Sequence, residues 1–184
     1  MRHKEQRVGI FIDVQNLYHS AKNLYKARVN FKELIKQLVD GRKLIRAIAY
    51  VVKTEGTEAE VKSEKNEAKG GHEAISGEAS FFDALKQAGI ELRMKDIQVF
   101  AGGAKKADWD VGMAVDSIRI ASFLDVVVLV TGDGDFVPLV EYLKWGLGRV
   151  VEVAAFSRTA SARLKEETDL FIGIEDIPKA LIRK

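Results

Sequence analysis

The sequence predicts an α/β protein built on a doubly wound parallel sheet of about five to six strands. Val126–Val130 is an uninterrupted apolar run of strand length, and such a run is typical of a strand buried on both faces. Arg7–Asp13 has the same character near the start of the chain. Strands of this kind alternate with stretches of helical periodicity, and this alternation indicates a parallel sheet with helices on both faces.

The first half of the chain supplies two strands and two helices. A helix is predicted directly after Asp13, because apolar residues recur at helical spacing over 14–25. Phe31–Val39 repeats this pattern, and Asp40 followed by Gly41 ends it. Leu44–Val52 is then the second strand.

The middle of the chain is predicted to resume with a short helix over Phe81–Ala88 and a third strand region over Ile90–Phe100. Ala101–Lys106 is expected to be a flexible basic loop. A longer helix should then run from Asp110 to Leu124. Its buried face is expected to consist of Val111, Ala114, Val115, Ile118 and Phe123.

After the central strand, Phe136–Trp145 is predicted to be a helix whose apolar face returns to the sheet, and Arg149–Phe156 a further strand. A helix over 161–169 and a short apolar segment over 170–174 follow. The chain is expected to end in a helix that starts near Asp176.

One segment departs from this composition. Thr54–Ala79 is rich in Glu and Lys and has almost no large apolar residue, so it cannot bury a core of its own. We expect a single domain over residues 1–184 with a charged insertion here. A long insertion at the carboxyl end of a strand is either a mobile lid over a site or an inert solvated excursion.

Composition limits the chemistry. The 184 residues are 47% hydrophobic and carry a formal net charge of only +2, so a nucleic-acid partner would need a local basic surface. No signal peptide or membrane span is apparent, and a cytoplasmic protein is expected. With no Cys and three scattered His, any metal must be held by oxygen.

Acidic residues follow the predicted central strands. Asp133 and Asp135 come after Val126–Val130, separated by single glycines, and Asp13 ends the first strand. The carboxyl ends of parallel strands are where sites form in such sheets. A simpler interpretation is that these acids cap the following helices. Asn16 could likewise cap its helix or face solvent.

Two further acids lie on the helix that enters the central strand. Asp110 is a natural first-turn acid. Asp116 lies near the predicted apolar stripe, so it needs either an ion pair with an Arg or a place at the edge of a site. Five carboxylates at one edge would repel one another without a cation. Oxygen ligands with open positions suit Mg²⁺ or Mn²⁺, and phosphoester hydrolysis uses such a pocket.

Three motifs resemble those of the NYN domain family, in its LabA-like branch, which is related to PIN-domain nucleases. They are FIDVQN at Phe11–Asn16, KKADWDVGMAVD at Lys105–Asp116 and VTGDGDF at Val130–Phe136, and the resemblance extends from Val8 to about Asp169. It implies a PIN-like three-layer sandwich and a divalent-metal-dependent endoribonuclease acting on RNA. The chain departs from the family pattern at Gly134, where Ser is common, and in the insertion.

The resemblance also implies roles for individual residues. The metal-binding acids would be Asp13, Asp110 and Asp133, with Asp116 and Asp135 in support. Asn16 matches the family's Asn after the first acid and is a candidate for substrate binding. The other candidates for substrate binding fall near the same edge by position, and Trp109 could equally belong to the core: Lys53, Lys105, Lys106, Trp109 and Arg158.

Two classes of function therefore stand. The first is a ribonuclease that uses Mg²⁺ or Mn²⁺, with Asp13, Asp110, Asp133 and Asp135 at the catalytic centre. The second is a non-catalytic RNA-binding or protein-interaction module on the same fold. The intact set of acids favours the first. RNA is the expected partner, no membrane partner is expected, and the sequence leaves open whether the protein is a homo-oligomer.

Overall fold

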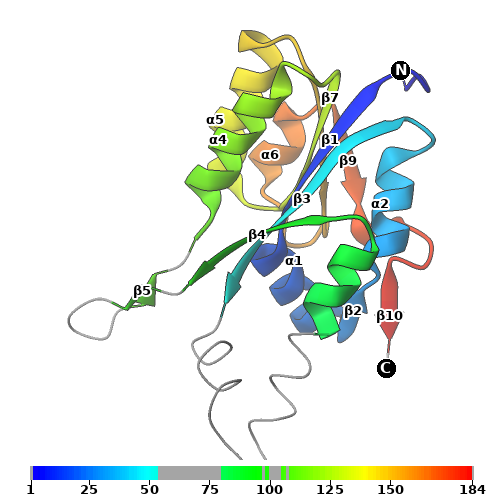
Figure 1. Ribbon diagram of the computed structural model, residues 1–184, viewed down its shortest axis with the longest axis vertical. Coiled ribbons are helices and arrows are strands. Elements are labelled where there is room, and N and C mark those ends of the chain that lie inside the picture. Colours follow the sequence, from blue (N-terminus) through cyan, green and yellow to red (C-terminus); the bar gives the residue numbers. More distant parts are fainter. Residues whose placement is uncertain (1, 54–79, 97, 100–104, 107, 184) are drawn as a thin grey trace, which may run out of the picture.

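A computed structural model describes residues 2–53, 80–96, 98–99, 105–106 and 108–183 (Figure 1). The predicted insertion at 54–79 lies outside the described residues. Within the described part, no helix is long and apolar enough to cross a membrane.

Six parallel strands form the main sheet, which confirms the predicted fold class. The central strands are β1 (Arg7–Asp13) and β7 (Val126–Val130), which pair with each other along their length. The sheet order is β4-β3-β1-β7-β8-β9, where β3 is Lys43–Lys53, β4 is Glu91–Asp96, β8 is Val150–Ala155 and β9 is Leu170–Gly173.

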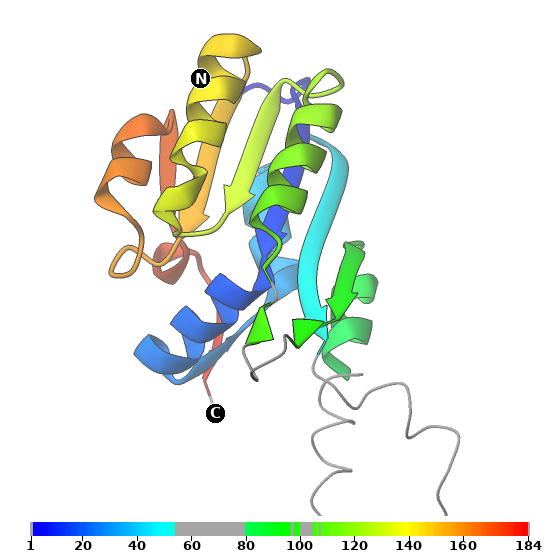
Figure 2. The same ribbon diagram turned by 90° about the vertical axis from the view of Figure 1, so that its left-hand side faces the viewer.

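Helices cover both faces of this sheet and make three layers (Figures 1 and 2). One face carries α1 (Val14–Ser20) with its π-helical continuation η1 (Ala21–Tyr25), α2 (Phe31–Val39) and the helix over 80–87. The other face carries α4 (Asp110–Ala121), α5 (Val137–Glu141) with its π-helical continuation η3 (Tyr142–Gly146), and α6 (Ala162–Glu167).

Strand β7 explains why the central run is apolar without interruption. Val126, Val128 and Val130 belong to the core on the α1 and α2 face, whereas Val127 and Leu129 belong to the core on the α4 and α5 face. Every residue of the strand is fully buried. A polar side chain at any of these positions would lie in one of the two cores.

Two short antiparallel ladders lie outside the main sheet. In the first, β5 (Gln98–Val99) pairs with β6 (Lys105–Lys106), so the predicted third strand region is divided and part of the predicted basic loop is a strand. In the second, β10 (Leu181–Arg183) pairs with β2 (Ala27–Val29).

The predicted terminal helix near Asp176 was wrong. The chain makes a single 3₁₀ turn, η4 (Ile174–Asp176), and then continues to β10. Ile177 is extended because it precedes Pro178, and that restriction prevents the turn from growing into a helix. Lys179, at φ 61°, redirects the chain toward β2.

The predicted buried face of α4 was wrong except for Ala114, which packs against the core. The residues that pack on the sheet are Met113, Ser117 and Ala121, while Val111 and Phe123 are exposed. Ser117 can be buried because its hydroxyl donates to the carbonyl oxygen of Met113 at 2.7 Å. Both stripes have helical spacing, and the structure buries the one with fewer apolar residues.

A buried ion pair lies at the amino-terminal side of the sheet. Glu152 of β8 accepts bidentate hydrogen bonds from Arg42, and the two side chains are 3% and 1% exposed. Arg42 also donates to the carbonyl oxygens of Leu38 and Val39 at the end of α2. Arg2 contributes a second guanidinium to the same carboxylate, which ties the start of the chain to the core.

Candidate active site

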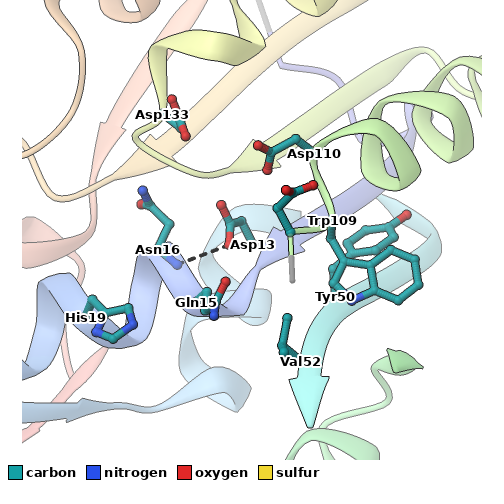
Figure 3. A pocket seen from close by; sticks show the side chains of 10 residues that line it. Asp13, Gln15, Asn16, His19, Tyr50, Val52, Trp109, Asp110 and Asp133 are labelled. Atoms are coloured by element: carbon teal, nitrogen blue, oxygen red, sulfur yellow. Dashed lines mark hydrogen bonds between the residues drawn. The ribbon is translucent and has the colours of Figure 1, made fainter. Parts of the chain in front are cut away.

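An open pocket of about 350 Å³ lies beyond the carboxyl ends of β1, β3 and β7 (Figure 3). The ends of β1 and β3, the turn after β7 and the first turns of α1 and α4 supply its wall, as expected for a parallel sheet. The residues that line it are Asp13, Gln15, Asn16, His19, Tyr50, Val52, Asp108, Trp109, Asp110 and Asp133.

Three carboxylates converge at this edge. Asp110, Asp133 and Asp135 each offer one oxygen atom, and these atoms lie within 4.8 Å of one another. Asp110 is the first residue of α4, whereas Asp133 and Asp135 belong to the turn after β7. Asp110 and Asp133 are half-buried, and Asp135 is exposed. The spacing and the oxygen-only ligands fit a hard divalent cation such as Mg²⁺ or Mn²⁺.

The capping role that the sequence left open also holds for two acids. Asp133 Oδ1 accepts from the backbone N–H of Asp135 at 2.9 Å and begins the 3₁₀ turn η2 (Gly134–Phe136). Asp13 Oδ1 accepts from the backbone N–H of Asn16 at 3.1 Å and begins α1 (Figure 3). Each residue uses one carboxylate oxygen for the cap, so capping and a place in the pocket are compatible.

Asp13 stands beside the three-acid group. Its second oxygen accepts from the Thr131 hydroxyl at 3.2 Å. Burial raises the pKa of the Asp13 carboxyl and the charge of Asp133 adds to this, whereas the hydrogen bonds from Asn16 and Thr131 oppose it. Burial also raises the pKa of Asp110, followed by the charges of neighbouring acids that include Asp13 and Asp133. The pocket therefore carries concentrated negative charge.

Asn16 connects the two sides of the pocket. Its side-chain Oδ1 accepts from the backbone N–H of Gly132 at 3.0 Å, so the first turn of α1 holds the loop after β7. This contact fixes the backbone just before Asp133. The Asn16 oxygen is thus engaged within the protein, and the residue still lines the pocket.

Gly134 lies in close contact with the loop after β8. A Cβ atom at this position would meet Ser161 Oγ at 2.9 Å and Ser161 Cβ at 3.2 Å. The same loop is held by a hydrogen bond from the Ser161 N–H to the carbonyl oxygen of Gly132. The acidic turn is therefore supported from two directions, by Asn16 and by Ser161.

Asp116 lies apart from the three-acid group. Its Oδ2 accepts from the Tyr50 hydroxyl at 3.1 Å and lies 3.6 Å from Arg93 Nε. Of the two explanations that the sequence left for this acid, the structure shows the ion pair with an Arg. Burial, and then the charge of Asp116, raise the pKa of Tyr50. The pair holds the central part of α4 against β3 and β4.

Trp109 is half-buried, and it both packs against the core and lines the pocket, the two roles that the sequence left as alternatives. Its indole N–H donates to the carbonyl oxygen of Val51 at 2.9 Å, and its ring centroid lies 5.4 Å from that of Tyr50. It also lines the pocket, and Lys95 Nζ lies 5.7 Å from its ring centroid. The ring is fixed in one orientation by these contacts.

The other residues predicted to bind substrate are not among the described residues that line the pocket. Lys53 ends β3 and Lys105 and Lys106 form β6, but their side chains lie outside the described part of the structure. Arg158 is exposed in the loop after β8, where its charge acts on Tyr25, and it does not belong to the lining of the pocket.

Sequence reasoning missed half of the residues that line the pocket, and it missed Lys95 beside Trp109; the missed lining residues are Gln15, His19, Tyr50, Val52 and Asp108. His19 follows Gln15 by four positions and Asn16 by three, so these residues lie along one side of α1. Lys95 is placed by the parallel register of β4 with β3, in which Val52 faces Lys95. The helical spacing of Gln15, Asn16 and His19 was a usable signal, whereas the register of β4 was not readable from the sequence.

The raised pKa values predict how stability depends on pH without metal. A group whose folded-state pKa is raised loses stabilisation as pH rises from its unfolded value, 3.8 for Asp110, through the folded value. Wild type should therefore lose stability relative to Asp110→Asn across this window. Chemical denaturation at several pH values, with a chelator present, measures the difference.

Asp125 is the matched control, because its pKa is shifted in the opposite direction from that of Asp110. Hydrogen bonds from Arg7 lower the pKa of Asp125 to about 2, so its contribution is present above the ordinary value and is lost as pH falls. Asp125→Asn should be less stable than wild type near neutral pH and converge with it in acid. If both variants changed in stability relative to wild type in the same direction as pH rises, the charge crowding at Asp110 would be contradicted.

Comparisons with known proteins agree with this architecture. The family model for the NYN domain matches residues 7–175. The low amplitude and bright protein LabA of Synechococcus elongatus is 28% identical over 103 residues, and the match spans 53% of this chain and 55% of that protein. The crystal structure of a Vibrio parahaemolyticus protein of unknown function superimposes with a TM-score of 0.79 and 26% identity, over 99% of both chains.

Proposed function

The chain belongs to the NYN domain family, a PIN-like nuclease family, and from this premise we propose that it is a divalent-metal-dependent endoribonuclease. The observation that carries the proposal is the convergence of Asp110, Asp133 and Asp135 at the carboxyl edge of the sheet. Three carboxylates at this spacing repel one another, and a bound cation removes that cost.

The residues fit Mg²⁺ or Mn²⁺. Asp110, Asp133 and Asp135 would hold the ion, and Asp13 adds a fourth carboxylate beside them. The bound ion would supply an activated water and stabilise the leaving oxygen of a phosphodiester. Open pockets suit these ions because they retain waters and reach substrate phosphates.

The protein's own contribution is to fix these groups before substrate arrives. Thr131 and the N–H of Asn16 hold both oxygens of Asp13, while the Asn16 side chain holds the loop that carries Asp133. Such preorganisation keeps charged groups in place during the reaction. Gln15, His19 and Trp109 line the same pocket and are available to contact a ribose, a phosphate or a base.

The test is cleavage of end-labelled single-stranded and double-stranded RNA and DNA by purified protein. We expect internal cleavage of RNA with Mg²⁺ or Mn²⁺ and none after chelation. Protein that binds RNA without cutting it under any of these conditions would favour the non-catalytic module. Cleavage that persists in chelator would contradict the metal dependence.

A further inference from the structure

An apolar stripe on α4 faces away from the sheet. Val111, Val115 and Ile118 are spaced at i, i+4 and i+7, so they align on one side of the helix. They are 74%, 46% and 37% exposed, respectively. Phe123, just beyond the helix, is exposed as well. Isolated exposed apolar residues are ordinary, but this aligned set is a surface that no described part of the chain covers.

Exposed aromatic residues also lie on the neighbouring helical segment of the same face. Tyr142 and Trp145 of η3 are exposed, and Trp145 is 81% exposed. The α5 and η3 segment covers the same face of the sheet as α4, beside it in both views (Figures 1 and 2). We define the α4 surface by these residues: Val111, Val115, Ile118, Phe123, Tyr142 and Trp145.

The area of the α4 surface is comparable with the largest apolar patch of a monomer and approaches that of a dimer interface. The three aromatic side chains offer roughly 150–250 Å² each, so their exposed fractions leave roughly 400 Å² per copy, to which the aliphatic stripe of α4 adds. The largest apolar patch on an ordinary monomer is about 300–600 Å², and a standard interface buries about 800 Å² per partner.

We propose that the α4 surface joins two copies of this chain in a two-fold symmetric dimer. The aligned stripe carries no charge, so it is complementary to itself, and a two-fold axis places the same patch on both sides of an interface. A second copy can therefore cover the α4 surface, and no other partner is needed. The dimer does not require that the site cleave RNA.

Charge at the ends of α4 selects the antiparallel arrangement. The first turn carries Asp110 and the last turn carries Arg119, which is exposed. In an antiparallel pair, Arg119 of each copy lies toward the acidic end of the other, and the two helix dipoles oppose each other favourably. A parallel pair would place like charges together. The two-fold axis then passes near Val115, close to the middle of the helix.

Analytical ultracentrifugation tests the dimer. Wild type should sediment with twice the mass of the chain, and Val115→Glu should raise the dimer dissociation constant by roughly a hundredfold or more, because each dimer would have to desolvate two added carboxylates near its centre. Ile182→Glu is the matched control, since Ile182 is an exposed aliphatic residue of β10. It should leave the dimer unchanged.

Cross-linking gives a second measurement that leaves the apolar character of the surface intact. The chain has no Cys, so Val115→Cys introduces one thiol per copy. Mild oxidation should convert this variant to a disulfide-linked dimer, while Ile182→Cys should stay largely monomeric on a denaturing gel. Wild type that remains monomeric into the hundred-micromolar range overturns the proposal. A dimer that survives Val115→Glu and does not cross-link at position 115, as expected of one joined through the open edge of β9, also overturns it.

Discussion

Asp133→Asn is expected to lower the rate of RNA cleavage by roughly a thousandfold, because it removes one charged ligand from the three-acid group. The fold should be retained, since the Asn side-chain oxygen can still accept the N–H of Asp135 that Asp133 accepts in wild type. Without metal, the variant should be at least as stable as wild type near neutral pH, because one of the crowded charges is gone.

The response to metal separates a ligand from a structural acid. A cation that binds only the folded protein stabilises it by RT ln(1 + [L]/Kd), about 2.7 kcal/mol at a hundredfold excess over Kd. Asp133→Asn should lose most of this gain in thermal melts with Mn²⁺. Asp116→Asn is the control, since Asp116 is paired with Tyr50 and Arg93 and its loss should leave the metal response intact. An Asp133→Asn protein that cleaves RNA normally and keeps the full metal shift would refute this site.

Glu152→Ala is expected to destabilise the protein by about 3–5 kcal/mol, the cost of leaving a buried charge without its partner. The Arg42 guanidinium is almost fully buried and would keep its bonds to the end of α2 while losing its counter-charge. Total stability of a domain is about 5–15 kcal/mol, so a loss of this size is visible as a large shift in a urea midpoint.

Two further variants control for this effect. Glu5 pairs with Lys43 at the surface, where both side chains are mostly exposed, and Glu5→Ala should cost only about 0–1 kcal/mol. Replacing both partners in Arg42→Met/Glu152→Leu should recover much of the stability lost in Glu152→Ala, because no unpaired charge remains. A loss of stability below about 1 kcal/mol for Glu152→Ala would contradict this prediction. It would show that the region around Arg42 opens locally and lets water reach the unpaired guanidinium.

The sequence was most informative where a residue's environment is set by its own strand. The bounds of β1 and β7 were predicted residue for residue, because a strand buried on both faces leaves no polar position inside it. The placement of Asp13 and Asp133 at strand ends then follows from parallel topology alone. For the same reason, the edge of the sheet that bears the pocket could be identified before any side chain was placed.

Prediction failed where tertiary contacts choose between equal local patterns. Helix α4 has two stripes of helical spacing, and the stripe with more apolar residues was chosen although Met113, Ser117 and Ala121 pack on the sheet. The carboxyl-terminal segment forms β10 because β2 offers it an edge, and that partner lies far away in the sequence. Asp116 shows the same limit, since its partners Tyr50 and Arg93 come from two other strands.

The contact between Gly134 and Ser161 has an evolutionary consequence. The resemblance to the NYN domain implies a serine where this chain has Gly134, and here the space that such a side chain would enter is occupied by the hydroxyl of Ser161. The two positions thus compete for one volume. Among relatives, a serine at the position of Gly134 should therefore be accompanied by glycine or alanine at the position of Ser161, or by a displaced loop. In an alignment of relatives, the two positions should therefore change together, with a serine at one of them but not at both.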